Sequence, residues 1–346
     1  MKAHPSFKIY IDNQVVDLTL LNRPGLDAAW QLTIINFIKD FQNDMPSLKV
    51  QTSGSTGTPK QITLLKSRMQ NSAKMTGAFL NLKENDKALL CLSADYIAGK
   101  MMLVRAMVLG LELHCFEPKT GVLKTINLHF AFAAMVPMQA MANLASIKNI
   151  DKLIIGGGRL SKANISLLTK TNHRGLYQTF GMTETISHVA LKLVSDKYYT
   201  ALKDITFSLS QNKTLIINAP NLLHEPITTN DLVDLKSGTS FEWLGRIDNV
   251  INSGGFKIIP EKVEAEISKI LEKPFFVFGI QDSRFGEKLV LFIEGEKRSF
   301  NSIELKSLEL NRFEIPKNVL FLKQFKRTET GKIQRKATVK EFLESA

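Results

Sequence analysis

Short apolar segments alternate with helical patterns through the middle of this 346-residue chain, and this alternation limits its fold more than any other feature. Residues 100–109 have a helical pattern that Gly110 closes, and Ser161 is placed to cap a later helix. Alternation of this kind predicts an α/β fold with functional loops at strand ends. The segments short and apolar enough to be buried strands are 88–92, 111–116, 152–155 and 175–180.

The flanking segments are less regular. Residues 7–20 alternate loosely, as in a short hairpin. Residues 27–41 have apolar side chains at helical spacing, with Asp27 as the expected N-cap. Residues 130–145 are interpreted as a helix-rich segment interrupted at Pro137.

From Asp231 onward the pattern changes to short strands around a glycine turn, followed by a charged helix and a strand pair. We therefore expect a large domain over residues 1–248 and a small α+β domain over residues 249–346. The elements expected in this part are strands 241–244, 249–251, 275–280 and 289–294 and a helix at 261–271.

The formal net charge of +12 suggests an anionic partner, but charge alone does not choose among nucleic acid, a membrane surface and phosphorylated small molecules. Residues 1–10 lack the apolar core of a signal peptide, and charges interrupt the most apolar stretch, 88–116. Cys91 and Cys115 are expected to be reduced core thiols. These features predict a cytoplasmic protein without a membrane span.

Residues 52–60 form the most distinctive loop, a run of hydroxyl side chains and glycines that ends in a lysine. Glycines let backbone N–H groups approach an anion, hydroxyl groups donate further hydrogen bonds, and Lys60 adds a positive charge. This chemistry suits a polyphosphate, although the spacing differs from the G-x-x-x-x-G-K-[ST] loop. A solvated polar turn is the alternative. The candidate phosphate ligands are Thr52, Ser53, Gly54, Ser55, Thr56, Gly57 and Lys60.

Other loops give weaker signals when each is taken alone. Residues 180–185 offer an aromatic face, a hydroxyl group and a carboxylate that suits Mg²⁺, but strand-to-helix turns often have this composition for structural reasons. Arg246 and Asp248 have the spacing of a surface ion pair of small worth. Residues 327–336 are typical of a basic solvated turn or a phosphate-contacting segment.

Taken together, these segments resemble the motifs of the adenylate-forming superfamily of acyl-CoA synthetases, adenylation domains and luciferase-like enzymes. The resemblance implies a large α/β adenylation domain and a small, mobile α+β C-terminal domain with a hinge at Asp248. It also implies activation of a carboxylic acid by ATP with Mg²⁺, followed by transfer of the acyl group to CoA. The matching segments are TSGSTGTPK from Thr52, YQTFGMTET from Tyr177, WLGRIDNVINSGG from Trp243 and RTETGKIQRK from Arg327.

The resemblance also implies roles for single residues. Phe180 stacks on adenine, Thr183 contacts the α-phosphate region, and Glu184 holds Mg²⁺. Lys332 enters the active site for adenylation. The residues implied as the floor of the adenine pocket are Gly156, Gly157 and Gly158.

In the later segments, Asp231 matches the aspartate that binds the ribose hydroxyls, although Asn230 replaces the glycine that usually precedes it. Arg246 contacts ribose or phosphate in such enzymes. The Gly254 and Gly255 turn gives room for pantetheine during thioester formation.

Two departures from the family pattern affect the expected site. Only 51 residues precede Thr52, so the chain lacks much of the usual first subdomain, and a partner chain is one way to supply its surface. Tyr96 stands where many relatives carry an aromatic or histidine gate. Tyrosine is compatible with the gating role.

Within the superfamily, the run from Tyr96 to Arg105 looks most like the compact o-succinylbenzoyl-CoA synthetases of menaquinone biosynthesis, whose substrate carries a second, aromatic carboxylate. Lys100 and Arg105 are candidates to hold that carboxylate, with solvent exposure or a local ion pair as the alternative. His188 is a further candidate for the acyl pocket, or a structural histidine.

The sequence leaves other functions open. The alternatives are a ligase for another aryl or short acyl acid and a catalytically silent adenylate-binding protein. Nucleic-acid binding is disfavoured because the chain has no basic motif interleaved with aromatic residues.

Overall fold

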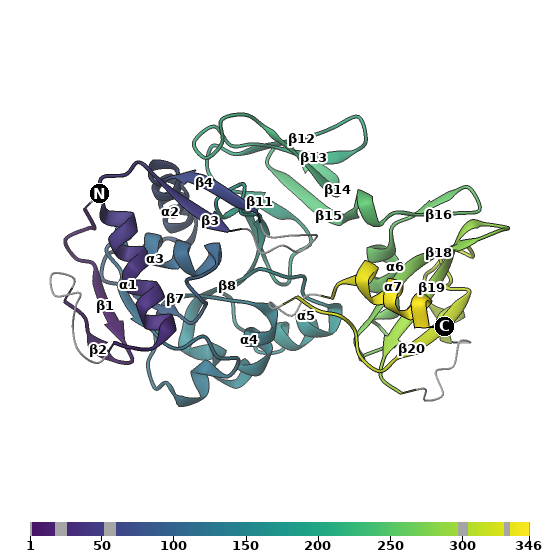
Figure 1. The fold of residues 1–346 in the computed structure, drawn as a ribbon, viewed down its shortest axis with the longest axis horizontal. Coiled ribbons are helices and arrows are strands. Elements are labelled where there is room, and N and C mark those ends of the chain that lie inside the picture. The colour runs from purple at the N-terminus through teal and green to yellow at the C-terminus, as the bar shows by residue number, and fades with distance from the viewer. Residues whose placement is uncertain (1, 18–25, 52–59, 297–303, 329–332, 346) are drawn as a thin grey trace. The chain divides into compact units, whose positions relative to one another are not determined.

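The computed structural model describes residues 2–17, 26–51, 60–296, 304–328 and 333–345 (Figure 1). The chain divides into two compact units. Unit 1 consists of Met1–Arg159, Ile165–Thr206 and Ile217–Pro226, and unit 2 consists of Leu160–Asn164, Phe207–Ile216 and Ile227–Ala346.

Unit 1 is built on a mixed sheet whose strands follow the order β11-β10-β9-β8-β7-β5-β6-β1-β2. The run from β9 to β1 is parallel, whereas β10, β11 and β2 pair antiparallel with their neighbours. The parallel strands confirm the predicted α/β fold. The strands are β1 (Lys8–Ile11), β2 (Gln14–Val15), β5 (Lys87–Leu90), β6 (Glu112–Cys115), β7 (Phe130–Met135), β8 (Ile150–Ile155), β9 (Leu176–Gly181), β10 (His188–Leu193) and β11 (Tyr199–Ala201).

Helices pack beside these strands, and α1 and α2 both contact α3 (Figure 1). Every side chain from Met101 to Met107 on α3 is buried, so this helix is enclosed on all sides rather than amphipathic. Gly110 ends it in the left-handed conformation, as predicted. The remaining elements are α1 (Ala29–Gln42), the hairpin β3 (Ser47–Gln51) and β4 (Gln61–Leu65), α2 (Lys66–Leu80), α3 (Ile97–Leu109), α4 (Pro137–Ala142) and α5 (Lys162–Thr169).

Two local predictions in unit 1 are wrong. The first half of residues 130–145 is the buried strand β7, and Pro137 begins α4 instead of interrupting a helix, because proline is well suited to a first helical turn. The N-cap of α1 is Ala28 rather than Asp27, and the side chain of Gln31 accepts the Ala28 N–H. The predicted cap at Ser161 is confirmed by its hydrogen bond from the Asn164 N–H.

Unit 2 contains the strand run β12-β13-β14-β15 and a second sheet in the order β17-β16-β19-β18, with β20 beside β19. Helix α6 contacts β18, and Val339 of α7 packs in a core cluster with Phe276 and Phe292 of this sheet. Val277, Leu291 and Ile293 are among the fully buried side chains of its core. The elements are β12 (Thr206–Leu209), β13 (Thr214–Asn218), β14 (Ile227–Ser237), β15 (Ser240–Arg246), β16 (Ile251–Ser253), β17 (Phe256–Ile258), α6 (Pro260–Ile267), β18 (Phe275–Asp282), β19 (Gly286–Glu294), β20 (Asn318–Leu322) and α7 (Arg335–Ser345).

Within the described residues, none of the helices has the length and apolar character that crossing a membrane requires.

Candidate functional site

The loops that follow β5, β8 and β9 lie at one edge of the parallel sheet, because parallel strands present their carboxyl ends to the same side. The loop after β5 leads through Tyr96, which is half-buried, into α3. The loop after β8 begins with Gly156, and the turn after β9 carries Thr183 and Glu184. The sheet topology therefore gathers several predicted site residues along one edge of unit 1.

Arg105 in unit 1 is a buried cation without a carboxylate partner among the described residues. Its side chain lies in the centre of α3 and is only 2% exposed. Burial lowers its pKa to about 9, so the guanidinium still carries its proton at neutral pH. Within the described residues its Nε has no hydrogen-bond partner, and no carboxylate pairs with the group. A buried cation without a counter-charge is costly for the fold.

A chain of polar side chains leads away from Arg105. Its Nη2 donates to Ser187 Oγ at 2.6 Å, and Ser187 Oγ lies 3.3 Å from His188 Nδ1. His188 Nε2 lies 3.0 Å from Thr76 Oγ1 on α2, and the Thr76 hydroxyl donates to the Ser72 carbonyl at 3.0 Å. Burial, and after it the charge of Arg105, holds the pKa of His188 well below its usual 6.5. His188 is therefore neutral at physiological pH.

Lys100 makes different contacts from the other cation of its helix. Its ammonium donates to the carbonyls of Ala94 at 2.5 Å and Asp95 at 2.7 Å, which belong to the loop before α3. Burial lowers its pKa, and the charge of Asp95 opposes that effect. The side chain thus holds the loop that carries Tyr96, and its contact with an acid substrate stays a prediction.

The turn between β9 and β10 is held in an unusual backbone conformation. Ile186 has a φ of 69°, which a β-branched residue rarely adopts, and its side chain is buried. The Thr185 hydroxyl supports the turn by accepting the Met182 N–H at 3.0 Å, and it lies 2.8 Å from the Ser187 carbonyl. Strain of this kind persists only where the surroundings enforce it, and it is common at functional sites. Exposed Glu184 lies within this turn.

Gly156 lies where β8 passes close to β9. A Cβ atom at Gly156 would lie 2.4 Å from Thr179 Oγ1, so a larger residue there would force the Thr179 side chain to move. Half-buried Phe180, at the end of β9, packs against Tyr199 with ring centroids 5.7 Å apart. A glycine segment next to an aromatic ring is a suitable surface for a flat heterocycle.

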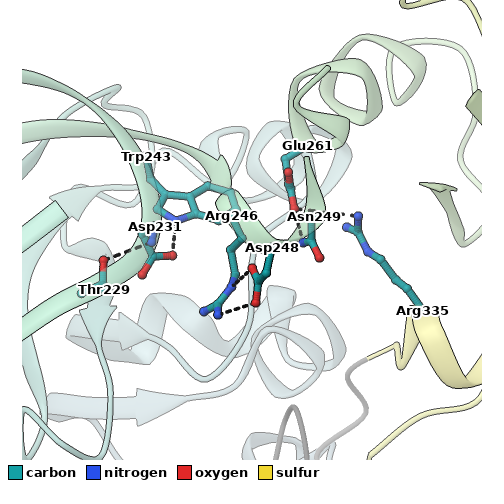
Figure 2. Close-up of polar contacts among 8 residues, drawn as sticks. All are labelled: Thr229, Asp231, Trp243, Arg246, Asp248, Asn249, Glu261 and Arg335. Carbon is teal, nitrogen blue, oxygen red and sulfur yellow. Dashed lines mark hydrogen bonds and ion pairs between the residues drawn. The ribbon is translucent and has the colours of Figure 1, made fainter. Parts of the chain in front are cut away.

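In unit 2, Asp231 is fixed by two neighbours (Figure 2). The Trp243 indole donates to Asp231 Oδ1 at 2.8 Å, and the Asp231 N–H donates to Thr229 Oγ1 at 3.1 Å. Burial raises the pKa of Asp231, and the hydrogen bond from Trp243 opposes that rise. A fixed carboxylate of this kind accepts hydrogen bonds well, which suits the implied contact with ribose hydroxyls.

Arg246 and Asp248 form the ion pair that their spacing predicted. Arg246 Nε and Nη2 donate to the two oxygens of Asp248, each at 2.9 Å (Figure 2). The hydrogen bond from Arg246 lowers the pKa of Asp248. The pair bridges the end of β15 and the residues that follow it, where the hinge is expected.

Glu261, at the start of α6, contacts Asn249, which precedes β16, and Arg335, which begins α7 (Figure 2). Its Oε1 accepts from Asn249 Nδ2 at 2.6 Å and lies 3.8 Å from Arg335 Nη1. Arg335 Nη2 also donates to Glu264 at 2.9 Å. Glu261 therefore joins the residue after Asp248 to the start of α7.

Gly254 and Gly255 form the turn between β16 and β17, and both are exposed. Their φ angles are 57° and 83°, a region that residues with a side chain rarely adopt. The turn therefore presents bare backbone, as the pantetheine role requires.

Part of the predicted site lies outside the described residues, namely Thr52–Gly57 and Lys332. Lys60 is described and exposed, just before β4. In the described residues, no cluster of three or more His, Cys, Asp or Glu side chains is arranged to hold a metal ion.

Several site residues were not found from the sequence, namely Thr76, Ser187, Trp243 and Glu261. Glu261 follows Pro260 at the start of a charged helix, and Trp243 belongs to a recognised motif, so both had a local signal. Thr76 had no local sequence signal, because its importance comes from its contact with His188, which is 112 positions away.

Comparison with known proteins places this arrangement in a family. A profile described as AMP-binding enzyme matches residues 3–222. The chain belongs to the AMP-binding enzyme family. An acyl-CoA synthetase (AMP-forming)/AMP-acid ligase II-like protein from Dyadobacter fermentans is 33% identical, with a TM-score of 0.63 over 94% of this chain and 98% of that chain.

Two further matches lie among named ligases. The 2-succinylbenzoate–CoA ligase of Listeria monocytogenes is 27% identical over 320 residues, covering 82% of this chain and 68% of the relative. The O-succinylbenzoate coenzyme A synthetase of Bacillus subtilis, solved in complex with ATP and magnesium, has a TM-score of 0.73 at 20% identity, over 84% of this chain and 69% of that chain. The second likeness shows that the AMP-binding enzyme shares the fold of these synthetases.

Proposed function

We propose that this AMP-binding enzyme is an AMP-forming ligase that joins 2-succinylbenzoate to CoA, a step of menaquinone biosynthesis. A carboxylate oxygen of the acid attacks the α-phosphorus of ATP, and the bond to pyrophosphate breaks. The CoA thiol then attacks the acyl carbon, the thiol proton is lost, and AMP leaves. This function agrees with the family and with the names of the relatives.

The observation that carries the choice of acid is the isolated guanidinium of Arg105. The acid reacts through its aliphatic carboxylate, which leaves the aromatic carboxylate to be held by the protein. Arg105 is buried, charged and without a carboxylate partner in the described residues, and its Nε has an unused donor. An anion bound there would supply the missing counter-charge. A monocarboxylic acid would leave the cost of burying Arg105 uncompensated.

The nucleotide is assigned to residues whose local geometry fits it. Phe180 stacks on adenine beside Gly156, Gly157 and Gly158, where a Cβ atom on Gly156 would collide with Thr179. Asp231 accepts hydrogen bonds from ribose, because Trp243 fixes its carboxylate. Thr52–Gly57 and Lys60 bind the phosphates. Bound Mg²⁺ would neutralise phosphate charge, with exposed Glu184 as its protein ligand.

The two half-reactions are assigned to different segments of the C-terminal part. Lys332 stabilises the charge that develops during adenylation, and the Gly254–Gly255 turn admits pantetheine during thioester formation. Asp248 is the hinge between residues 1–248 and residues 249–346. Tyr96 gates the acid channel, and Thr183 contacts the α-phosphate region. We place the enzyme in the cytoplasm, where ATP and CoA are supplied.

ATP–pyrophosphate exchange tests the proposal, measured with 2-succinylbenzoate and with 4-oxo-4-phenylbutanoate, which has the same skeleton without the aromatic carboxylate. We expect exchange with both acids, and an apparent KM for 2-succinylbenzoate lower by about 100-fold, the worth of a buried charge pair. CoA should then convert the adenylate to a thioester.

Other results would redirect the assignment. Equal KM values for the two acids would assign the enzyme to a different aryl or short acyl acid. Binding of AMP without exchange for any acid would indicate a silent adenylate-binding protein. A Lys332→Ala variant sharpens the test, because it should lose exchange while retaining thioester formation from preformed acyl-adenylate.

A further inference from the structure

Thr76 lies on α2, outside every motif, yet it ends the polar chain that begins at Arg105. Thr76 is 0% exposed and His188 is 7% exposed, so both side chains are buried. In a buried series of polar side chains, each donor needs an acceptor in a defined direction.

The donor-to-acceptor order of these hydrogen bonds follows from Arg105, which can only donate. Ser187 Oγ must therefore accept from Arg105, which leaves the Ser187 hydroxyl proton for His188 Nδ1. His188 then carries its proton on Nε2 and donates to Thr76 Oγ1, and Thr76 donates to the Ser72 carbonyl. In this arrangement Ser187, His188 and Thr76 each donate once and accept once.

We propose that Thr76 is a positioning residue for the second carboxylate of the acid, acting through His188 and Ser187 on Arg105. Thr76 accepts the Nε2 proton and so fixes the imidazole in one tautomer. The imidazole in turn holds the Ser187 hydroxyl, whose oxygen fixes one end of the guanidinium. Arg105 is thereby held with a buried Nε–H donor that no group of the described residues accepts. This inference rests on the proposed function.

Replacing Thr76 with valine keeps the shape of the side chain but removes the acceptor. The His188 Nε2–H would be left buried without a partner, so the ring would turn or change tautomer and loosen Ser187. We expect the apparent KM for 2-succinylbenzoate to rise about 10-fold, while kcat and the KM for ATP stay within about twofold. The KM for 4-oxo-4-phenylbutanoate should not change, because that acid has no second carboxylate.

Two further variants separate positioning from packing. Thr76→Ser keeps the hydroxyl and should restore the KM for 2-succinylbenzoate. Thr169→Val is the matched control, because Thr169 makes the same type of helix back-bond, to the Ile165 carbonyl at 2.9 Å, but is exposed on α5. It should leave the KM values for both acids unchanged.

An NMR measurement reports on the hydrogen bonds from Arg105 to Thr76 without substrate turnover. The ¹⁵N shifts of the His188 ring should show protonated Nε2 and unprotonated Nδ1 in the wild type, and a different tautomer balance in Thr76→Val. An unchanged spectrum and unchanged KM values would overturn the inference, as would an equal KM rise for both acids. Failure of the wild type to use 2-succinylbenzoate would instead reject the proposed function, and the spectrum would still decide whether Thr76 fixes the tautomer.

Discussion

Arg105 in unit 1 and Arg327 in unit 2 are cations in opposite electrostatic settings. Arg327 donates from Nη1 and Nη2 to the two oxygens of Glu294, each at 2.6 Å, and Glu294 also accepts the Phe325 N–H. Arg105 is more deeply buried, yet its strongest contact is to a neutral hydroxyl. One arginine is paired within its own unit, whereas the other retains unused binding capacity. Arg327 thus serves the fold of unit 2, whereas we propose that Arg105 serves a ligand.

The largest effect that this contrast predicts is functional. Arg105→Met should raise the apparent KM for 2-succinylbenzoate by about 100-fold and bring it close to the KM for 4-oxo-4-phenylbutanoate. The melting temperature should stay the same or rise, because methionine removes an uncompensated buried charge. Steady-state kinetics with both acids and thermal unfolding of the same variant check the two expectations.

Lys100→Met is the competing variant, since Lys100 lies on the same helix but donates to backbone carbonyls of the loop that carries Tyr96. The two variants together decide which cation holds the second carboxylate. A large rise in the acid KM for Lys100→Met with little change for Arg105→Met would reverse the assignment.

The second-largest expected effect is a loss of folding stability when Arg327 is replaced. Arg327→Met should lower the free energy of unfolding by about 2 kcal/mol, between the values typical of exposed and buried ion pairs, because it leaves Glu294 without its main partner. The acid KM should not change. Chemical denaturation at pH 7, compared with Arg105→Met, checks this prediction, and a loss of acid affinity without a loss of stability would contradict the contrast.

The same pair has a predictable pH dependence. The hydrogen bond from Arg327 holds the pKa of Glu294 below its ordinary 4.5, so the folded state binds this proton more weakly than the unfolded state. The stabilisation is therefore fully present above pH 4.5 and is lost as the pH falls through the lower folded pKa. The difference in unfolding free energy between wild type and Arg327→Met should shrink over that acidic range.

The fold was largely predictable because it depends on local patterns. Apolar segments at strand length and the helix closed by Gly110 gave the parallel sheet and α3. The error at 130–135 has a physical cause, since a short, fully apolar segment has the same pattern in a buried strand as in a buried helix.

The site was less predictable because its chemistry depends on contacts between distant residues. Arg105 was a candidate from the sequence, but the lack of a counter-charge is a property of the folded surroundings. The contact between Thr76 and His188 joins residues 112 positions apart, and no local pattern marks it. The nucleotide motifs were recognisable because their residues are adjacent in sequence.

The smallest expected effect on stability lies at the Arg246–Asp248 pair. Both side chains are 36% exposed, so solvent screens their attraction despite the bidentate geometry. Asp248→Ala should therefore change the free energy of unfolding by less than about 1 kcal/mol. If Asp248 is also the hinge, the variant should alter the ratio of the rates of adenylation and thioester formation, measured separately by pyrophosphate exchange and by conversion of preformed acyl-adenylate. A loss of stability equal to that of Arg327→Met, with an unchanged rate ratio, would mean that this pair serves the fold rather than the change between half-reactions.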